Sequence, residues 1–162
     1  MKVFVAESGS GSSVVARELH AVLPLTVHGV ETFLATTDLP KGVPWSSELL
    51  QRLDDADAGI FCVTPEALRN GWFNFEGGVI FNRNRQRLVC AYVVSGKVPP
   101  SSPFSLFQLT QATEDETFQL FRQLNDALDK RMQPDQLRRA FEAFWPALEG
   151  AIAKARNGNG RA

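Results

Sequence analysis

The sequence predicts an α/β domain with a mainly parallel sheet and helices on both of its faces. Apolar runs alternate along the chain with segments of helical periodicity, the pattern that builds such sheets. Two of these runs, 58–63 and 88–94, are apolar almost throughout, as expected of strands covered on both sides. With 162 residues, the chain is long enough to enclose a full hydrophobic core.

The first elements follow from apolar runs and the residues that interrupt them. Lys2–Ala6 predicts a buried first strand. The Ser- and Gly-rich segment 8–13 predicts a loop that caps a helix, and we expect Pro24 to end that helix. Residues 30–35 predict the second strand. Segment 36–44 contains Asp, Pro and Gly, and therefore predicts a loop.

The middle of the chain predicts three more strands. A helix is expected to open at Trp45, and Ala58–Val63 predicts the third strand. One helix is expected over 65–81, although it contains glycines. Residues 88–94 give the clearest strand pattern of the chain, and residues 106–109 predict a short fifth strand.

Two amphipathic segments, 114–130 and 134–156, predict the closing helices. We therefore expect a single domain over residues 1–156. Residues 157–162 carry no apolar side chain except the final alanine, and we expect them to be a disordered tail.

Composition excludes several classes of function. Apolar residues make up 44% of the chain and charged residues 22%, with a formal net charge of −1. No general attraction to nucleic acid or to an anionic membrane follows from such a balance. The N-terminus lacks the apolar core of a signal peptide, and no apolar run is long enough to cross a bilayer. We expect a cytoplasmic protein with no direct contact to nucleic acid or membrane.

Cysteine and histidine usage points away from metal and disulfide chemistry. Cys62 and Cys90 lie inside apolar runs, where a thiol is usually a small buried hydrophobe. His20 and His28 do not stand at ligand spacing from a cysteine or acid, so no metal site is expected.

The segment 72–78 carries the most informative pair of residues. Glu76 is the only acid between Glu66 and Glu114. On a helix, Trp72 and Glu76 share one face because they stand four residues apart. An indole packed on the core beside a solvated acid is the ordinary interpretation. The apolar, glycine-containing flanks instead favour a carboxylate in a low-dielectric site, where it is either costly or functional.

Two loops could contribute to such a site. The 8–13 loop does not match a dinucleotide fingerprint, because Val14 stands where the third glycine would be. It could still present free amides to a phosphate, or it could serve only as a helix cap. In the second loop, Pro40 limits the backbone and Gly42 permits a positive φ. Trp45 follows at the same edge of the predicted sheet.

Together these segments resemble bacterial Toll/interleukin-1 receptor (TIR) domains. The likeness runs in order over nearly the whole chain and rests on five pieces: 2–5; Ser8, Gly9 and Ser10, into which 2–5 leads; 38–42 with Trp45; 59–66; and 72–78. The resemblance implies a flavodoxin-like fold, an α/β architecture with a five-stranded, mainly parallel sheet and helices on both faces.

The resemblance also implies an activity. Many such domains cleave NAD⁺ at the nicotinamide–ribose bond with the glutamate of a Trp-x-x-x-Glu pattern, which Trp72 and Glu76 match. Glu76 is then the catalytic residue, and NAD⁺ is a substrate, with no cofactor required. The expected substrate-binding residues are Ser8, Gly9, Ser10, Asp38, Leu39, Trp45 and Trp72, and the expected assembly loop contains Pro40, Lys41 and Gly42.

One carboxylate suits this reaction. Nicotinamide leaves as a neutral ring, so no general acid is required, unlike in ordinary glycoside hydrolysis. A glutamate that is hydrogen-bonded to the ribose hydroxyls stabilises the positive charge that develops on the sugar. The chain departs from the family pattern at Ala6-Glu7, where a Ser-Tyr or Ser-His pair is usual, and Glu7 is expected to alter phosphate affinity.

Partners and alternatives complete the expectation. The resemblance implies self-association through TIR–TIR contacts, an activating partner or sensor, and a role in antiphage defence by NAD⁺ depletion or a cyclised ADP-ribose signal. The first alternative is a TIR scaffold that only recruits proteins through the 38–44 loop. A more distant alternative is a nucleoside deoxyribosyltransferase, which also uses a glutamate on a flavodoxin-like sheet.

Overall fold

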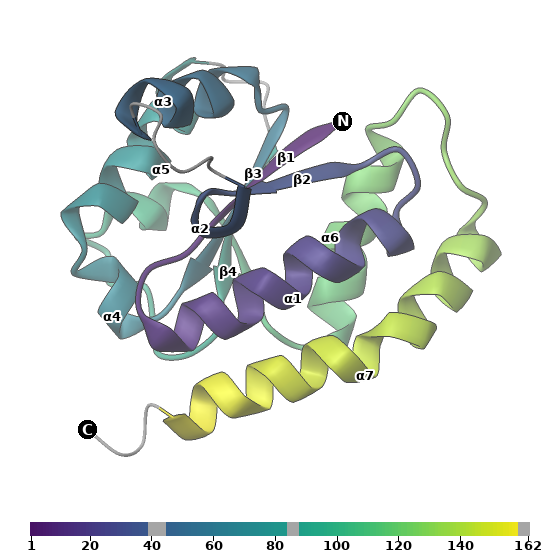
Figure 1. The fold of residues 1–162 in the computed structure, drawn as a ribbon. Helices are drawn as coiled ribbons and strands as arrows, with labels where there is room; N and C mark the ends of the chain where they lie inside the picture. The colour runs from purple at the N-terminus through teal and green to yellow at the C-terminus, as the bar shows by residue number, and fades with distance from the viewer. Residues whose placement is uncertain (39–44, 84–87, 159–162) are drawn as a thin grey trace.

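The computed structural model describes residues 1–38, 45–83 and 88–158 (Figure 1). Five strands form one sheet, in which every neighbouring pair is parallel and the order is β2-β1-β3-β4-β5. This order is the flavodoxin-like one, and it confirms the predicted fold class. The strands are β1 (Lys2–Ala6), β2 (Glu31–Leu34), β3 (Ala58–Val63), β4 (Leu88–Val93) and β5 (Gln108–Gln111).

Helices cover both faces of the sheet, each over its own apolar cluster. On one face, α1 and α7 lie side by side, and α6 completes the layer (Figure 1). On the other face, α3 and α5 pack together, with α4 and a short 3-10 helix, η1. The helices are α1 (Ser10–Thr26), α2 (Ala35–Asp38), α3 (Trp45–Asp55), α4 (Pro65–Leu68), α5 (Gly71–Arg83), η1 (Pro103–Leu106), α6 (Glu114–Asp126) and α7 (Pro134–Gly158).

The expectation that Pro24 ends the first helix is wrong, because α1 continues to Thr26. Proline has no N–H to donate to the carbonyl four residues earlier, which is that of His20. In the structure, the Thr32 hydroxyl donates to that carbonyl at 3.0 Å. The side chain of a neighbouring strand thus satisfies the acceptor that the proline leaves free.

The single helix expected over 65–81 is two helices with a break at Asn70. The Asn70 side chain accepts hydrogen bonds from the backbone N–H groups of Trp72 and Phe73, at 2.8 and 3.1 Å. An asparagine in this position starts a new helix. α5 is therefore a separate helix, in which Glu76 is buried together with Phe73 and Ile80.

Two further elements differ from expectation. The fifth strand begins at Gln108 rather than at 106, because Phe104 and Phe107 both turn into the core around η1. The segment expected as a loop after β2 begins with the short helix α2, whose Asp38 carboxylate accepts a hydrogen bond from the Leu34 N–H at 2.8 Å. The hydrogen bond between Leu34 and Asp38 thus holds the single turn of helix that directly follows β2.

The two glycines in the middle of α5 have opposite roles. A Cβ at Gly77 would lie 2.9 Å from the buried ring of Phe104, whereas a Cβ at Gly78 would meet nothing within 4 Å. Gly77 therefore lets α5 approach η1 closely. We expect Gly77→Val to lower the free energy of unfolding by about 2 kcal/mol through overpacking. Gly78→Ala should raise it by about 0.5–1 kcal/mol through helix propensity.

Urea denaturation of the two variants measures both effects. Because each variant changes a glycine of the same helix, Gly78→Ala serves as the control for the effect of propensity alone. Equal stability of the two variants would contradict the close approach at Gly77.

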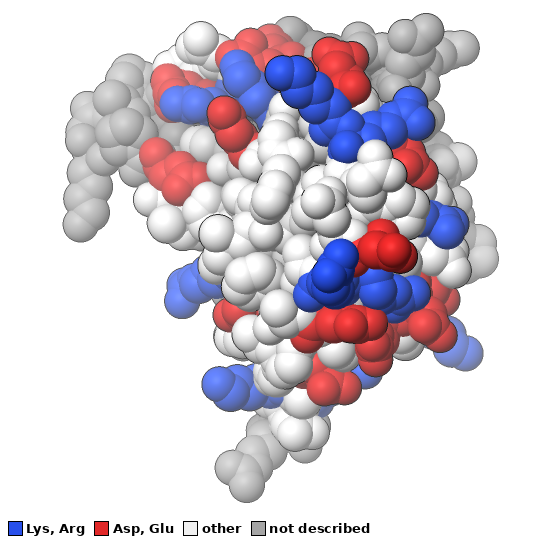
Figure 2. All heavy atoms as spheres, turned by 90° about the vertical axis from the view of Figure 1, so that its right-hand side faces the viewer, with Lys and Arg blue, Asp and Glu red and all other residues white. Residues whose placement is uncertain are grey.

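Charges are mixed on the face that Figure 2 shows, the right-hand side of Figure 1. Lysine and arginine alternate there with aspartate and glutamate around an uncharged band, without a large field of one sign. Among the described residues, no helix combines the length and apolar character that a bilayer span requires.

Candidate functional site

A small cavity of about 130 Å³ lies at the carboxyl ends of β1 and β2, against α5. In open parallel sheets, ligands bind at this edge, close to the point where the strand order reverses. Here the order reverses at β1, whose neighbours are β2 and β3. The lining residues come from three segments: Phe4, Val5, Ala6 and Glu7; Leu34, Ala35 and Thr36; and Trp72 and Glu76.

Glu76 is the buried acid of this cavity. Only 5% of its surface is exposed, although it stands in the middle of α5 between the core residues Phe73 and Ile80. Burial raises the pKa of its carboxyl to about 8, a hydrogen bond with the Trp72 side chain opposes this rise, and the charge of Glu7 adds to it. The interpretation as a solvated surface acid therefore does not describe this residue.

Trp72 lies one helical turn before Glu76 and lines the same cavity. An indole can only donate, so its ring N–H is the donor of the hydrogen bond to the Glu76 carboxyl. The indole is still 37% exposed, and its ring contacts that of Phe75 at a centroid distance of 5.0 Å. Trp72 thus forms one wall of the cavity and also orients the acid.

Glu7 is a second carboxylate in the cavity, at the end of β1. The Ser13 hydroxyl donates to its Oε2 atom at 2.5 Å. Because Ser13 lies in the first turn of α1, this hydrogen bond ties the end of β1 to that helix. The residue that departs from the family pattern therefore stands beside the predicted catalytic acid.

Ser8, Gly9 and Ser10 lead into α1 next to the cavity but do not line it. The Ser8 N–H donates to the Ser12 hydroxyl at 2.8 Å, so part of the loop is satisfied internally. Gly9 has a φ of +86°, and the carboxyl of Glu66 packs against it where a side chain would begin. An anion that approaches α1 from this side meets a carboxylate.

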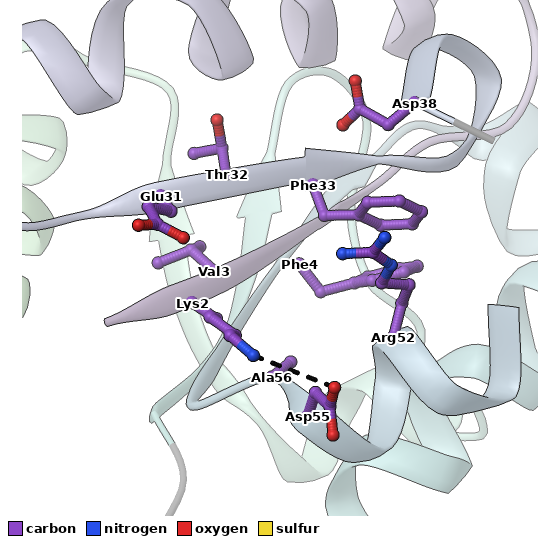
Figure 3. A pocket seen from close by; sticks show the side chains of 10 residues that line it. All are labelled: Lys2, Val3, Phe4, Glu31, Thr32, Phe33, Asp38, Arg52, Asp55 and Ala56. Atoms are coloured by element: carbon purple, nitrogen blue, oxygen red, sulfur yellow. Dashed lines mark ion pairs between the residues drawn. The ribbon is translucent and has the colours of Figure 1, made fainter. Parts of the chain in front are cut away.

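Asp38 lies in a different cavity from Glu76. That cavity, of about 250 Å³, lies between β2 and α3, and Lys2 and Glu31 at the amino ends of β1 and β2 are among its lining residues (Figure 3). Asp38 pairs with His20 at 3.5 Å, and Arg52 lies over the Phe33 ring at 5.1 Å. Phe4 lines both cavities and separates them. The structure thus does not bring Asp38 to the buried acid.

The other predicted site residues fall outside what is described. Leu39 and the assembly-loop residues Pro40, Lys41 and Gly42 lie between the described ranges 1–38 and 45–83. Trp45 is the first residue of α3, as predicted, and only its backbone is described. For these five residues the roles stay predictions.

The sequence interpretation overlooked the wall supplied by β2 and α2. Leu34, Ala35 and Thr36 line the cavity, but none of them has a distinctive side chain. Their position was the available signal, because they follow the end of a strand adjacent to β1. Within the described ranges, no group of three His, Cys, Asp or Glu residues could hold a metal ion.

The hydrogen bond from Trp72 gives a testable prediction. In Trp72→Phe the ring wall remains but the N–H is lost, so the pKa of Glu76 should rise further above about 8. Following the carboxyl signal of Glu76 in a ¹³C-labelled protein through a pH titration measures this change. The same titration in Phe75→Leu is the control, because Phe75 contacts the indole without lining the cavity. An unchanged titration in Trp72→Phe would contradict the hydrogen bond.

Comparison with known proteins identifies the family of the chain. A search of the curated proteins found no match. Residues 3–125 match the family model described as the TIR domain, which spans β1 through nearly all of α6 and includes both acids of the cavity. Since the match covers well over half of the chain and the sheet has the flavodoxin-like order, the chain belongs to the TIR domain family.

Proposed function

We propose that this TIR domain is an NAD⁺ nucleosidase that cleaves the bond between nicotinamide and ribose. The single observation that carries the proposal is the buried Glu76 carboxyl, held by Trp72 in a cavity at the carboxyl edge of the sheet. Burial of a carboxyl costs free energy, and no Lys, Arg or His is among the described residues that line this cavity. Such a costly buried acid is typical of a functional site.

The chemistry follows from the charge on the substrate. The nicotinamide ring of NAD⁺ is positively charged, so its approach favours the ionised form of Glu76. When the glycosidic bond breaks, its electron pair moves to the ring nitrogen and nicotinamide leaves neutral. The positive charge moves to the ribose, where the Glu76 carboxylate stabilises it. Water then adds to the ribose and releases a proton to give ADP-ribose, or an adenine nitrogen of the same molecule bonds to the ribose instead and gives a cyclised ADP-ribose.

The size of the cavity supports activation by assembly. Its volume of about 130 Å³ is below the range of about 300–1,000 Å³ that is usual for small-molecule sites. The site must therefore open before it can hold the nicotinamide riboside half of NAD⁺. TIR domains self-associate, and formation of an open head-to-tail assembly is the change that we propose enlarges the cavity. An activating partner or signal would then control the enzyme.

Measuring nicotinamide release tests the proposal. The protein should release nicotinamide from NAD⁺ at high concentration or in filaments, and strictly monomeric protein should release little. Full activity of a monomer would refute activation by assembly. The absence of nicotinamide release under every assembling condition, with no effect of Glu76→Ala in cells, would refute the enzyme itself.

A scaffold function is the second candidate, and a surface feature favours it. Trp72 and Phe75 are 37% and 44% exposed and contact each other, which is the kind of aromatic pair that protein interfaces bury. A pure scaffold should still form oligomers or bind partners after Glu76→Ala. It should lose them after substitution of Pro40 or Gly42. Pull-down and sedimentation experiments with these variants separate the two functions.

The biological role that we propose is an effector of bacterial antiphage defence. An enzyme whose site stays closed until the protein assembles does not consume the NAD⁺ of the resting cell. Once assembly activates the enzyme, it depletes that NAD⁺ or produces a signal. The third alternative, nucleoside deoxyribosyl transfer, is tested by incubation of the protein with a deoxynucleoside and a free base.

A further inference from the structure

We propose that Glu7 is a specificity-determining residue that, together with Glu76, makes the cavity select a ring of positive charge over a neutral ring of the same shape. The inference deepens the proposed function, on which it rests for the identity of the substrate. It concerns recognition, however, and can be tested without turnover. Such a cavity would bind the oxidised dinucleotide, whose nicotinamide ring is a cation, more tightly than the reduced form, whose ring is neutral.

The composition of the cavity wall is the first argument. Seven of the nine described lining residues bring no formal charge, and the remaining two are Glu7 and Glu76. No Lys, Arg or His is among these described lining residues. Two carboxylates that share a cavity with mostly apolar walls repel each other when both are ionised. A cation placed between them removes this repulsion, whereas a neutral ring leaves it in place.

The position of Glu7 is the second argument. Glu7 lines the cavity, and the Ser13 hydroxyl donates to its carboxylate at 2.5 Å, which holds the charge at the junction of β1 and α1. The effect of Glu7 on its neighbour is already present in the empty site, where its charge contributes to the raised pKa of Glu76. The two acids that line the cavity are therefore electrostatically coupled.

The neighbouring charges do not replace this pair. Asp38, on α2, has its carboxylate paired with His20 and lines the separate cavity beside α3. Glu66, on α4, packs against Gly9 at the start of α1 and does not line the cavity. Among the described lining residues that α5 contributes, Glu76 is the only charged one. Selection by charge thus falls to Glu7 and Glu76.

A binding experiment with two small probes tests the inference. We would titrate the protein with 1-methylnicotinamide, which is a cation, and with nicotinamide, which is neutral, and follow the indole N–H signal of Trp72 by NMR. At pH 9, Glu76 is largely ionised in the wild type, and also in Glu7→Gln, because loss of the neighbouring charge lowers the pKa of Glu76. The wild type should bind the cation at least about tenfold more tightly than nicotinamide, and Glu7→Gln should reduce this preference roughly tenfold.

A second readout distinguishes recognition from a merely structural role of Glu7. Affinity for the cation should rise with pH as Glu76 ionises. In Glu7→Gln the midpoint of that rise should move to lower pH, because the neighbouring negative charge is gone. Glu18→Gln, which removes an acid of α1 that does not line the cavity, is the matched control and should change neither readout.

The outcomes separate the two proposals. If the wild type does not prefer the cation, or if Glu7→Gln keeps the full preference and the same midpoint, the inference about Glu7 is overturned even when NAD⁺ is cleaved. If the preference depends on Glu7 but no nicotinamide is ever released from NAD⁺, the cavity selects cationic rings and the nucleosidase proposal fails alone.

Discussion

Glu76→Gln is expected to reduce nicotinamide release at least about a thousandfold, which corresponds to a loss of roughly 4 kcal/mol of transition-state stabilisation. Glutamine has nearly the same shape as the protonated acid and can still accept a hydrogen bond from Trp72. It cannot carry a negative charge, however, and the proposed mechanism needs that charge when the ribose becomes positive. The fold should therefore persist while the chemistry is lost.

The measurement is single-turnover release of nicotinamide by assembled protein, with assembly checked by sedimentation in the same samples. Glu149→Gln removes an exposed acid from α7, far from the cavity lining, and is the control for the loss of one charge. It should keep the full rate. A Glu76→Gln protein that assembles and retains more than about a tenth of the wild-type rate would remove Glu76 from the mechanism.

The sheet could be predicted from the sequence because its signals are local. Strands β1, β3 and β4 are apolar runs with clear boundaries, and parallel connection through helices leaves few arrangements for the remaining two strands. The pair Trp72 and Glu76 was visible for the same reason, since a spacing of four on a helix fixes a shared face. Both inferences use only residues that lie close together in the sequence.

The elements that were placed wrongly depend on contacts between distant residues. Pro24 could stay inside α1 only because Thr32, on a different element, supplies a hydrogen bond to the His20 carbonyl. The shift of β5 depends on Phe104 and Phe107 finding space beside Phe61 of β3, at centroid distances of 5.3 and 6.2 Å. No local pattern reports whether such a partner exists.

The site was predicted in part for a related reason. Sequence reasoning grouped residues by the edge of the sheet at which their strands end, but residues that follow strands at one edge do not all line the same cavity. Asp38 lines the cavity beside α3, whereas Glu7 and Thr36 line the same cavity as Glu76. Side-chain direction at the end of each strand decides between the cavities, and it follows from α2 and from the Ser13 hydrogen bond, which only the folded chain shows.

The buried acid should also make the stability of the protein depend on pH. The pKa of Glu76 is raised from 4.5 to about 8 in the folded protein. Between these two values the folded state binds more protons than the unfolded state, so the free energy of unfolding falls as pH rises. The contribution is complete below about pH 4.5, is lost progressively up to about pH 8, and changes little above that.

Comparison with Glu76→Gln isolates this contribution from all other titrating groups. At pH 5 the two proteins should have similar free energies of unfolding, because the wild-type acid is protonated and resembles the amide. By pH 9 the wild type should have lost roughly 2–4 kcal/mol relative to the variant, since each unit of pKa difference corresponds to about 1.4 kcal/mol. Urea denaturation at both pH values gives the difference directly. If the two stability profiles run parallel between pH 5 and 9, Glu76 is ionised and hydrated in the resting protein, and the cavity is already open to water before assembly.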